Sequence, residues 1–338
     1  MNSYERLLAR IHGKPVDRVP NLCIMMGFAA KYAGIPYEDF CLCPEKMVEA
    51  NLLVQKAFDL DLVTVMSDPY GEAMDYGMEV VFPHDANPHA KHFFWGDDPT
   101  LTSIPLRTEV TEGRMADRIR AISLYADKVK GNIPIAGWVE GAVAEYCDLR
   151  NINDAMVDFA LEEPFLDEIL TRLTEQAIIY LDAQIKAGAD IIGIGDAACS
   201  LMGPELYHKY GFPYEQRLVH AIHDRGALVK LHICGNTGPL LPDLAKLGVD
   251  IFDLDWMVDF SQAVKEFRGI SSVNGNFDPV AVLQEGTPTQ VRQAVLDRLS
   301  VDSSTTIISA GCEVPRDTPY ENLHMVADTI RDICVSVS

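Results

Sequence analysis

The chain has 338 residues, of which 48% are hydrophobic and 23% charged, and it carries a formal net charge of −22 at pH 7. This composition is typical of a globular protein, and so acidic a chain is a poor partner for nucleic acid or for anionic membrane surfaces. The longest apolar runs are far shorter than the roughly 20 residues needed to cross a bilayer, and the N-terminus lacks the apolar core of a signal peptide, so we expect a cytoplasmic protein without a membrane segment.

Short apolar runs rich in β-branched residues alternate along the chain with segments of helical apolar spacing. The first element is expected to be a helix at Ser3–Ile11. After it, strands are expected at residues 19–26, 62–66, 133–139, 190–194, 228–234, 249–254, 271–276 and 305–310. Helices are expected to follow most of them, at residues 163–186, 204–224, 240–247, 260–268, 288–299 and 319–335. Such alternation predicts a parallel sheet covered by helices.

Eight strands over about 300 residues favour an α/β fold of the closed (β/α)8 barrel (TIM barrel) type over an open sheet. The segment from residue 70 to residue 132 is longer than one crossover requires. We interpret it as an insertion after the second strand, with a hairpin around residues 78–82 and 92–95 and a helix near residues 113–129. No linker-like stretch interrupts the chain, so residues 1–338 are predicted to form a single domain.

Side chains that can bind a metal or carry a proton follow nearly every expected strand. In chain order they are Asp68, Glu140, Asp196, His232 with Cys234, Asp255, Asn276 with Asp278, and Cys312. In (β/α)8 barrels the chemistry takes place at this end of the strands. Each aspartate and asparagine has an alternative explanation, because these residues are also common in turns and helix caps.

The most informative stretch is residues 228–237, where an expected strand ends in His232, Ile233 and Cys234. Side chains alternate between the two faces of a strand, so His232 and Cys234 point the same way. Cys312 follows the last expected strand, across the barrel mouth from the fifth. An imidazole and two thiolates suit zinc and leave a fourth position open, as a catalytic zinc site requires.

The alternative is a set of buried side chains without a metal. The eight cysteines are irregularly spaced and lack the pattern of a secreted disulfide framework, so we expect them to be free, buried or metal-bound. For any single cysteine, burial in the core is the more common outcome.

A second motif points to a different ligand. Residues 193–198 match the glycine pattern G-x-G-x-x-A of dinucleotide-binding turns. However, they follow the fourth of eight expected strands, and Gly203 and Pro204 interrupt the helix that the phosphates would require. We therefore expect no nucleotide there.

Three motifs in the last third of the chain carry a resemblance to a known family. They are His232-Ile233-Cys234-Gly235-Asn236-Thr237, Asn274-Gly275-Asn276-Phe277-Asp278-Pro279, and residues 311–319, which begin Gly-Cys-Glu-Val-Pro-Arg. Residues 72–77 and 196–200 also look similar to family segments. Over essentially its whole length the chain resembles the uroporphyrinogen decarboxylase superfamily, and within it the methylcobamide:thiol methyltransferases.

The resemblance implies a zinc ion held by His232, Cys234 and Cys312. In that family zinc binds the acceptor's thiol as a thiolate, which attacks the methyl group of a methylcobamide. The resemblance therefore implies zinc and a corrinoid such as methylcobalamin as cofactors. It implies a corrinoid protein as the partner, and a thiol or a folate as the small methyl acceptor.

The remaining strand-end residues receive roles on the same basis. Glu140 and Asp196 are candidates for catalytic residues that position the substrates or add a zinc ligand. Asp68, Asn276 and Asp278 are candidates for cofactor binding. Residues 28–37 and 138–141 differ from the acceptor-binding segments of the methanogen enzymes, so the acceptor stays open, and a homodimer is an expectation from the family alone.

Porphyrinogen decarboxylation is the main alternative function. The decarboxylases grip several carboxylates with an arginine-rich segment after the first strand, yet here no arginine occurs between Arg18 and Arg107. Arginine suits bidentate carboxylate binding, so this grip is missing, although Asp68 could stand where the decarboxylases place an aspartate that binds the pyrroles. A corrinoid-binding protein without catalytic activity is the third hypothesis.

Overall fold

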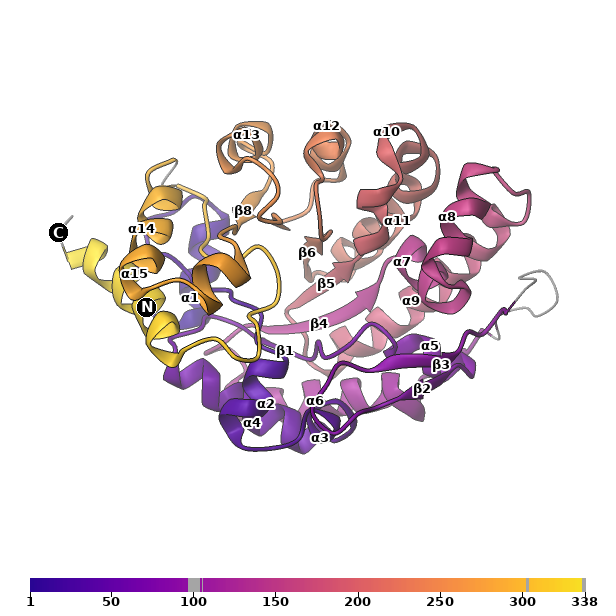
Figure 1. The fold of residues 1–338 in the computed structure, drawn as a ribbon, viewed down its shortest axis with the longest axis horizontal. Helices are drawn as coiled ribbons and strands as arrows, with labels where there is room; N and C mark the ends of the chain where they lie inside the picture. The colour runs from indigo at the N-terminus through magenta and orange to yellow at the C-terminus, as the bar shows by residue number, and fades with distance from the viewer. Residues whose placement is uncertain (97–103, 105, 302–303, 336–338) are drawn as a thin grey trace.

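The computed structural model describes residues 1–96, 104, 106–301 and 304–335. Its main feature is a sheet of six parallel strands in the order β1 (Val63–Thr64), β4 (Ile135–Glu140), β5 (Ile191–Gly195), β6 (Leu228–His232), β7 (Ile251–Asp253) and β8 (Ser272–Asn274). Helices surround this sheet, with α2, α4 and α6 on one side and α10, α12 and α13 on the other (Figure 1). The expected parallel α/β architecture is confirmed.

The first and last expected strands connect the two edges of this sheet. Asn21 bridges Ile308 in parallel, Ile307 bridges Asn274 of β8, and the backbone N–H of Asp61, just before β1, donates to the carbonyl of Asn21. These segments form isolated bridges instead of the strands that we expected. One reason is that Pro20 has no backbone N–H, although its carbonyl still accepts a hydrogen bond from Ile308. The arrangement is consistent with the expected (β/α)8 barrel.

The expected helices are present apart from local breaks, and α2, α3, α4, α5, α7 and α8 are additional helices that were not expected. They are α1 (Ser3–Ile11), α2 (Gly27–Ala33), α3 (Tyr37–Leu42), α4 (Pro44–Ala57), α5 (Gly71–Tyr76), α6 (Gly113–Val129), α7 (Ala142–Arg150), α8 (Ile152–Ala160), α9 (Leu166–Ala187), α10 (Gly203–Leu206), α11 (Phe212–His223), α12 (Leu241–Leu244), α13 (Phe260–Glu266), α14 (Pro288–Leu299) and α15 (Tyr320–Val335). Short 3₁₀ or π segments are η1 (Ala197–Leu201), η2 (Tyr207–Gly211), η3 (Gly238–Leu240), η4 (Ala245–Leu247) and η5 (Pro279–Gln284). None of the described helices is long and apolar enough to cross a membrane.

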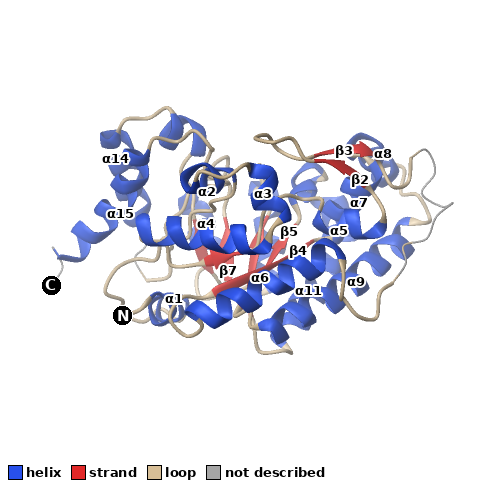
Figure 2. Cartoon of the chain, turned by 90° about the horizontal axis from the view of Figure 1, so that it is seen from below, coloured by secondary structure: helices blue, strands red, loops and turns tan. Residues whose placement is uncertain are grey.

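Helix α5, a hairpin and helix α6 lie between β1 and β4. The hairpin pairs β2 (Glu79–Val81) with β3 (His89–His92) in antiparallel fashion, so its second strand lies a few residues before the expected position. It is seen beside α5, α7 and α8 in Figure 2. Residues 97–103 and 105 of the expected insertion lie outside the described residues, and the insertion itself stays a prediction.

A buried ionic cluster joins α1 to the segment before β1. The carboxylate of Asp61 is fully buried and accepts hydrogen bonds from Arg6 and Arg18, both at 2.6 Å, and from the backbone N–H of Asn21 at 2.9 Å. Both guanidinium groups are largely buried, because the exposed fractions of their side chains are 8% and 14%. Asp61 therefore holds three chain segments together.

Asp61→Ala is expected to lower the free energy of unfolding by about 3 kcal/mol, since it leaves buried guanidinium groups short of a partner. Asp17→Ala is the matched control, because Asp17 also pairs with Arg6 but its side chain is 40% exposed. That control should lower the free energy of unfolding by about 1 kcal/mol or less. Urea denaturation followed by circular dichroism measures both, and equal losses would contradict the role given to Asp61.

Candidate functional site

A cavity of about 170 Å³ opens at the carboxyl ends of the strands. Its lining comes from the carboxyl ends of six of the eight expected strands and from the residues just after them, and comprises Ile24, Met26, Met66, Asp68, Pro69, Trp138, Glu140, Gly195, Ala197, His232, Cys234, Cys312 and Glu313. Five of the predicted site residues therefore share one cavity. Three others, Asp196, Asn276 and Asp278, do not line it.

His232, Cys234 and Cys312 converge at one side of this cavity. His232 Nε2 lies 3.0 Å from Cys234 Sγ and 3.9 Å from Cys312 Sγ, and the two sulfurs are 3.6 Å apart. His232 is the last residue of β6, and the pleat carries Cys234 to the same face two residues later. The seven cysteines whose side chains are described are all free.

The three donor atoms fit a tetrahedral zinc site. With Zn–S bonds of about 2.3 Å and a Zn–N bond of about 2.0 Å, neighbouring ligand atoms lie about 3.5–3.8 Å apart. The separations of 3.0, 3.6 and 3.9 Å bracket that range. One imidazole and two sulfurs are also a soft donor set of the kind that zinc prefers, and three protein ligands are the number that catalytic zinc sites use.

The electrostatics of the two thiols differ. The hydrogen bond with Cys234 and the neighbouring His232 lower the pKa of Cys312 to about 4, although burial opposes this shift. Burial alone would lower the pKa of His232, but the contact with Cys312 and the charge of Asp253 together raise it. Cys312 is thus the more acidic of the two thiols and the one better prepared to serve as a thiolate ligand.

A buried carboxylate behind His232 was missed by the sequence analysis. Asp253 Oδ2 lies 3.7 Å from His232 Nδ1, which is buried and makes no hydrogen bond. The same oxygen pairs with Lys230, and Asp253 Oδ1 accepts a hydrogen bond of 2.8 Å from Asn274. The strand register explains this row, because His232 is opposite Asp253 and Asp253 is opposite Asn274. The available signal in the sequence was Lys230, which lies two residues before His232 and therefore on the same face of the strand.

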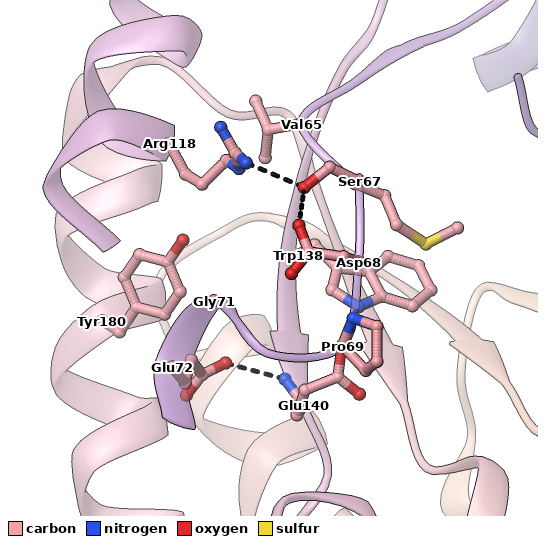
Figure 3. Close-up of a pocket in the computed structure, with 11 residues that line it drawn as sticks. Val65, Ser67, Asp68, Pro69, Gly71, Glu72, Arg118, Trp138, Glu140 and Tyr180 are labelled. Carbon is pink, nitrogen blue, oxygen red and sulfur yellow. Dashed lines mark hydrogen bonds between the residues drawn. The ribbon is translucent and has the colours of Figure 1, made fainter. Parts of the chain in front are cut away.

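Asp68 lies at the cavity wall within a network of buried arginines. Arg114 donates to its carboxylate at 2.6 Å, and the side chain of Asp68 is 1% exposed. Burial would raise the pKa of Asp68, but Arg114 and Arg118 together lower it below its usual value. Figure 3 shows the hydrogen bonds that link Arg118 to Ser67 and Ser67 to Asp68. Its charge is therefore already balanced by the protein.

Glu140, the last residue of β4, reaches the cavity beside Trp138. The indole N–H of Trp138 donates to its carboxyl group at 2.9 Å. Burial, together with the negative charges of Asp148 and Glu72, raises the pKa of Glu140 well above its usual value. Glu72 accepts a hydrogen bond from the backbone N–H of Glu140 at 2.8 Å, as Figure 3 shows.

The glycine motif of β5 serves the packing of Trp138. A Cβ atom on Gly193 would lie 2.2 Å from Trp138 Cε3, and one on Gly195 would lie 2.6 Å from Trp138 Cζ2. Distances this short are not compatible with a side chain, so both glycines make room for the indole ring. This explains the G-x-G spacing without a nucleotide.

Asp196 turns away from the cavity. It is fully buried and accepts a hydrogen bond of 2.7 Å from the backbone N–H of Ala144 in the first turn of α7. Its carboxylate and the side chains of Cys199 and Glu215 place their polar atoms within 4.8 Å of one another. The described position favours a structural role for Asp196 over contact with a substrate.

The stability of the protein is expected to fall as the pH rises from 4 to 7, in part because of Asp196. Burial raises the pKa of this carboxyl to about 7 from 3.8, although the hydrogen bond from Ala144 acts against the shift. The native state therefore binds the proton more tightly than the unfolded state, so this stabilisation is present below pH 4 and is lost as the pH passes 7. Asp196→Asn should flatten this slope, whereas Asp127→Asn, at an exposed aspartate, should leave it unchanged. Urea titrations at several pH values measure it, and identical slopes in all three proteins would refute the assignment.

Asn276, Asp278 and Asp255 support loops in the described structure. The amide of Asn276 donates to the carbonyls of Asp255 and Val258, at 3.0 and 2.8 Å. Asp278 caps η5 by accepting from the backbone N–H groups of the second and third residues of that segment. Asp255 accepts from the backbone N–H of Met257. These are the turn and cap roles that the sequence left as alternatives.

Known proteins resemble the chain over nearly all of its length. The chain is 27% identical to a methylcobamide:CoM methyltransferase MtbA from Methanosarcina mazei, with 97% of each chain covered. It is 26% identical to a uroporphyrinogen decarboxylase from Synechococcus sp. (strain JA-3-3Ab), with 97% of this chain and 92% of the other covered. A solved methyltransferase structure from Methanosarcina mazei superposes with a TM-score of 0.89 at 23% identity, covering 98% of this chain and 99% of that one.

Comparison with sequence models of protein families places the chain with these relatives. The model described as Uroporphyrinogen decarboxylase (URO-D) matches residues 2–333. Methyltransferases and decarboxylases both occur among the relatives, so membership alone does not select the reaction. The match spans nearly the whole chain, and the chain therefore belongs to the uroporphyrinogen decarboxylase (URO-D) family.

Proposed function

We propose that the protein is a zinc-dependent methyltransferase that moves a methyl group between a corrinoid and a small acceptor, a thiol. The observation that carries this proposal is the convergence of His232, Cys234 and Cys312 beside the 170 Å³ cavity. The relatives named methylcobamide:CoM methyltransferase support it. We further propose that the chain acts as one cytoplasmic domain spanning residues 1–338 and receives the corrinoid from a partner protein.

The residues of the chain have distinct roles in this proposal. His232, Cys234 and Cys312 would hold the zinc, which when bound supplies a Lewis acid that lowers the pKa of an acceptor thiol. Asp253 faces the other nitrogen of His232 and orients the imidazole. Ile24, Met26 and Met66 form an apolar wall that excludes water from the acceptor sulfur.

In the proposed transfer, the bonds and electrons gained by the acceptor match those lost by the corrinoid. The acceptor thiol first releases its proton, and the sulfur then attacks the methyl carbon. A carbon–sulfur bond forms while the cobalt–carbon bond breaks, and cobalt keeps the electron pair of that bond as cob(III)amide becomes cob(I)amide. The chain contributes by holding the sulfur and the methyl group close together in an orientation that permits attack.

The cavity argues against porphyrinogen decarboxylation. Three carboxyl groups, those of Asp68, Glu140 and Glu313, belong to its lining, and the described lining residues include no lysine or arginine. A substrate that carries many carboxylates would find no bidentate cationic partner in this lining, whose carboxyl groups offer only neutral, already paired or like-charged oxygen atoms. The volume of about 170 Å³ is also below the range of roughly 300–1,000 Å³ that is usual for pockets of drug-sized ligands.

The test is demethylation of methylcobalamin, followed by its visible spectrum, with a panel of thiols and with tetrahydrofolate. We expect zinc-loaded protein to produce cob(I)alamin and a thioether with at least one thiol. Transfer to tetrahydrofolate alone would replace the thiol with a folate as acceptor. Loss of carboxyl groups from uroporphyrinogen, without any methyl transfer, would establish the decarboxylase alternative. Binding of methylcobalamin without either reaction would leave a corrinoid-binding protein.

A further inference from the structure

The charge of the cavity lining bears on which acceptor the protein uses. Carboxyl groups reach the cavity from three separate strand ends, in Asp68 after β1, in Glu140 at the end of β4 and in Glu313 after the last expected strand. Glu313 accepts a hydrogen bond of 2.9 Å from the backbone N–H of Gly27. The three groups therefore place negative or neutral oxygen atoms around the space beside Cys312.

Cationic side chains are present nearby, but each is buried and already bound. Arg114 is held by Asp68 at 2.6 Å. Arg118 donates to Ser67 and to the backbone carbonyl of Cys41. Lys230 pairs with Asp253. These three residues are at most 5% exposed and do not line this cavity. Arg118 lines the smaller cavity of Figure 3, and its Nη1 makes no hydrogen bond. That smaller cavity, of about 30 Å³, shares Asp68 and Glu140 with the larger one but is not lined by His232, Cys234 or Cys312.

The rest of the wall is apolar. Ile24, Met26, Met66 and the indole of Trp138 face the space between the carboxyl groups and the two sulfurs. Such a surface receives the short alkyl body of a small thiol well, because its burial removes apolar area from water. A charged end group on that thiol must then exchange its water for the polar groups of the lining.

This lining offers no favourable partner to an anionic end group. Ionised carboxylates repel it, and protonated ones are neutral, so neither protonation state offers a positive partner. An uncharged or cationic end group can instead donate hydrogen bonds to the same carboxyl oxygens. Moving an anionic end group out of water without a new partner therefore costs more free energy than moving an end group that gains hydrogen bonds to the carboxyl oxygens.

We infer that the acceptor pocket selects small thiols without a negative charge, unlike 2-mercaptoethanesulfonate (coenzyme M), the acceptor in the names of the MtbA and MtaA relatives. This inference rests on the proposed methyl transfer and names the substrate class for that site. Glu140 and Glu313 set the preference, because Arg114 already balances the charge of Asp68.

Three thiols of nearly equal size test the inference with the zinc-loaded full chain and methylcobalamin. They are cysteamine, 2-mercaptoethanol and 2-mercaptoethanesulfonate, which carry a positive, no and a negative charge at the remote end. We expect kcat/KM to be at least about tenfold lower for the sulfonate than for either of the others when compared at equal thiolate concentration. Comparison at equal thiolate concentration removes the differences in the pKa values of the free thiols.

Variants test whether the charges of the cavity, and no other feature, cause the preference among the three thiols. Met26→Lys places a cation at the half-exposed wall position, and should raise kcat/KM for the sulfonate relative to cysteamine by about tenfold. Met26→Gln is its uncharged control. Glu313→Gln should narrow the gap between the thiols, whereas Glu266→Gln, at an exposed site on α13, should leave the ratio unchanged. A gain of sulfonate activity in Met26→Lys cannot result from misfolding.

The outcomes distinguish this inference from the proposed function. A wild-type protein that prefers the sulfonate, or treats all three thiols alike, overturns the inference and leaves methyl transfer intact. An unchanged preference in Met26→Lys, with zinc content preserved, also overturns it. Absence of transfer to all three thiols removes the proposed thiol methyltransferase and the inference with it.

Discussion

Cys312→Ala is expected to lower the zinc content of the purified protein from about one ion per chain to below about 0.2, and to abolish methyl transfer. Cys312 supplies one of three donor atoms, and its Sγ lies 3.6 Å from Cys234 Sγ and 3.9 Å from His232 Nε2. Two remaining ligands from a single strand form too open a site to hold zinc against dilution. Plasma emission analysis of protein purified without added metal measures the content.

A matched control separates the site from general effects of removing a thiol. Cys43 is also half-buried, but it lies just before α4, where its Sγ contacts Glu45 at 3.6 Å. Cys43→Ala should keep both zinc and activity. Equal zinc contents in wild type and Cys312→Ala would refute the metal site. Loss of zinc with methyl transfer retained would instead show that the metal plays no part in the reaction.

Asp253→Asn is expected to lower the zinc affinity about 10–100-fold, with a loss of stability. Three donors surround this carboxylate: Lys230, the amide of Asn274 at 2.8 Å and the Nδ1 of His232 at 3.7 Å. An asparagine offers one acceptor oxygen and directs an amide N–H₂ toward the remaining donors. The imidazole then loses the partner that fixes its orientation, and Lys230 becomes a buried cation without a counterion.

A second substitution separates affinity from stability. Lys230→Met in the Asp253→Asn background removes the unpaired cation and should restore most of the free energy of unfolding, while the zinc affinity stays low. Asp224→Asn, at an exposed aspartate after α11, serves as the control. Competition with a chromophoric chelator measures the affinity and urea denaturation the stability. If zinc affinity recovers together with stability, Asp253 acts only by keeping the barrel interior folded.

The alternation of strands and helices and the motifs could be predicted from the sequence, because both depend only on residues close together in the chain. The pleat of one strand sufficed to place His232 and Cys234 on one face. The resemblance also rested on short motifs, and the match over residues 2–333 confirms the family. The zinc ligands, the acceptor and the partner protein, by contrast, stay predictions that the experiments above address.

Side-chain directions at the strand ends could not be obtained in this way. Asp68, Glu140 and Asp196 each follow a strand, yet Asp68 is paired with Arg114, Glu140 reaches the cavity, and Asp196 caps α7. Where a side chain points after its strand ends depends on the path of the loop and on helices far away in the sequence. Local pattern carries no information on either.

The sequence by itself determined the alternation of parallel strands with their main helices, the family, and the pair of His232 and Cys234, because these follow from local periodicity and motifs. Only the tertiary structure decided that Cys312 lies within 4 Å of both, that Asp253 stands behind the imidazole, and that carboxyl groups surround the cavity. Those contacts join residues 21 to 80 or more positions apart, and the closing of a parallel sheet sets them.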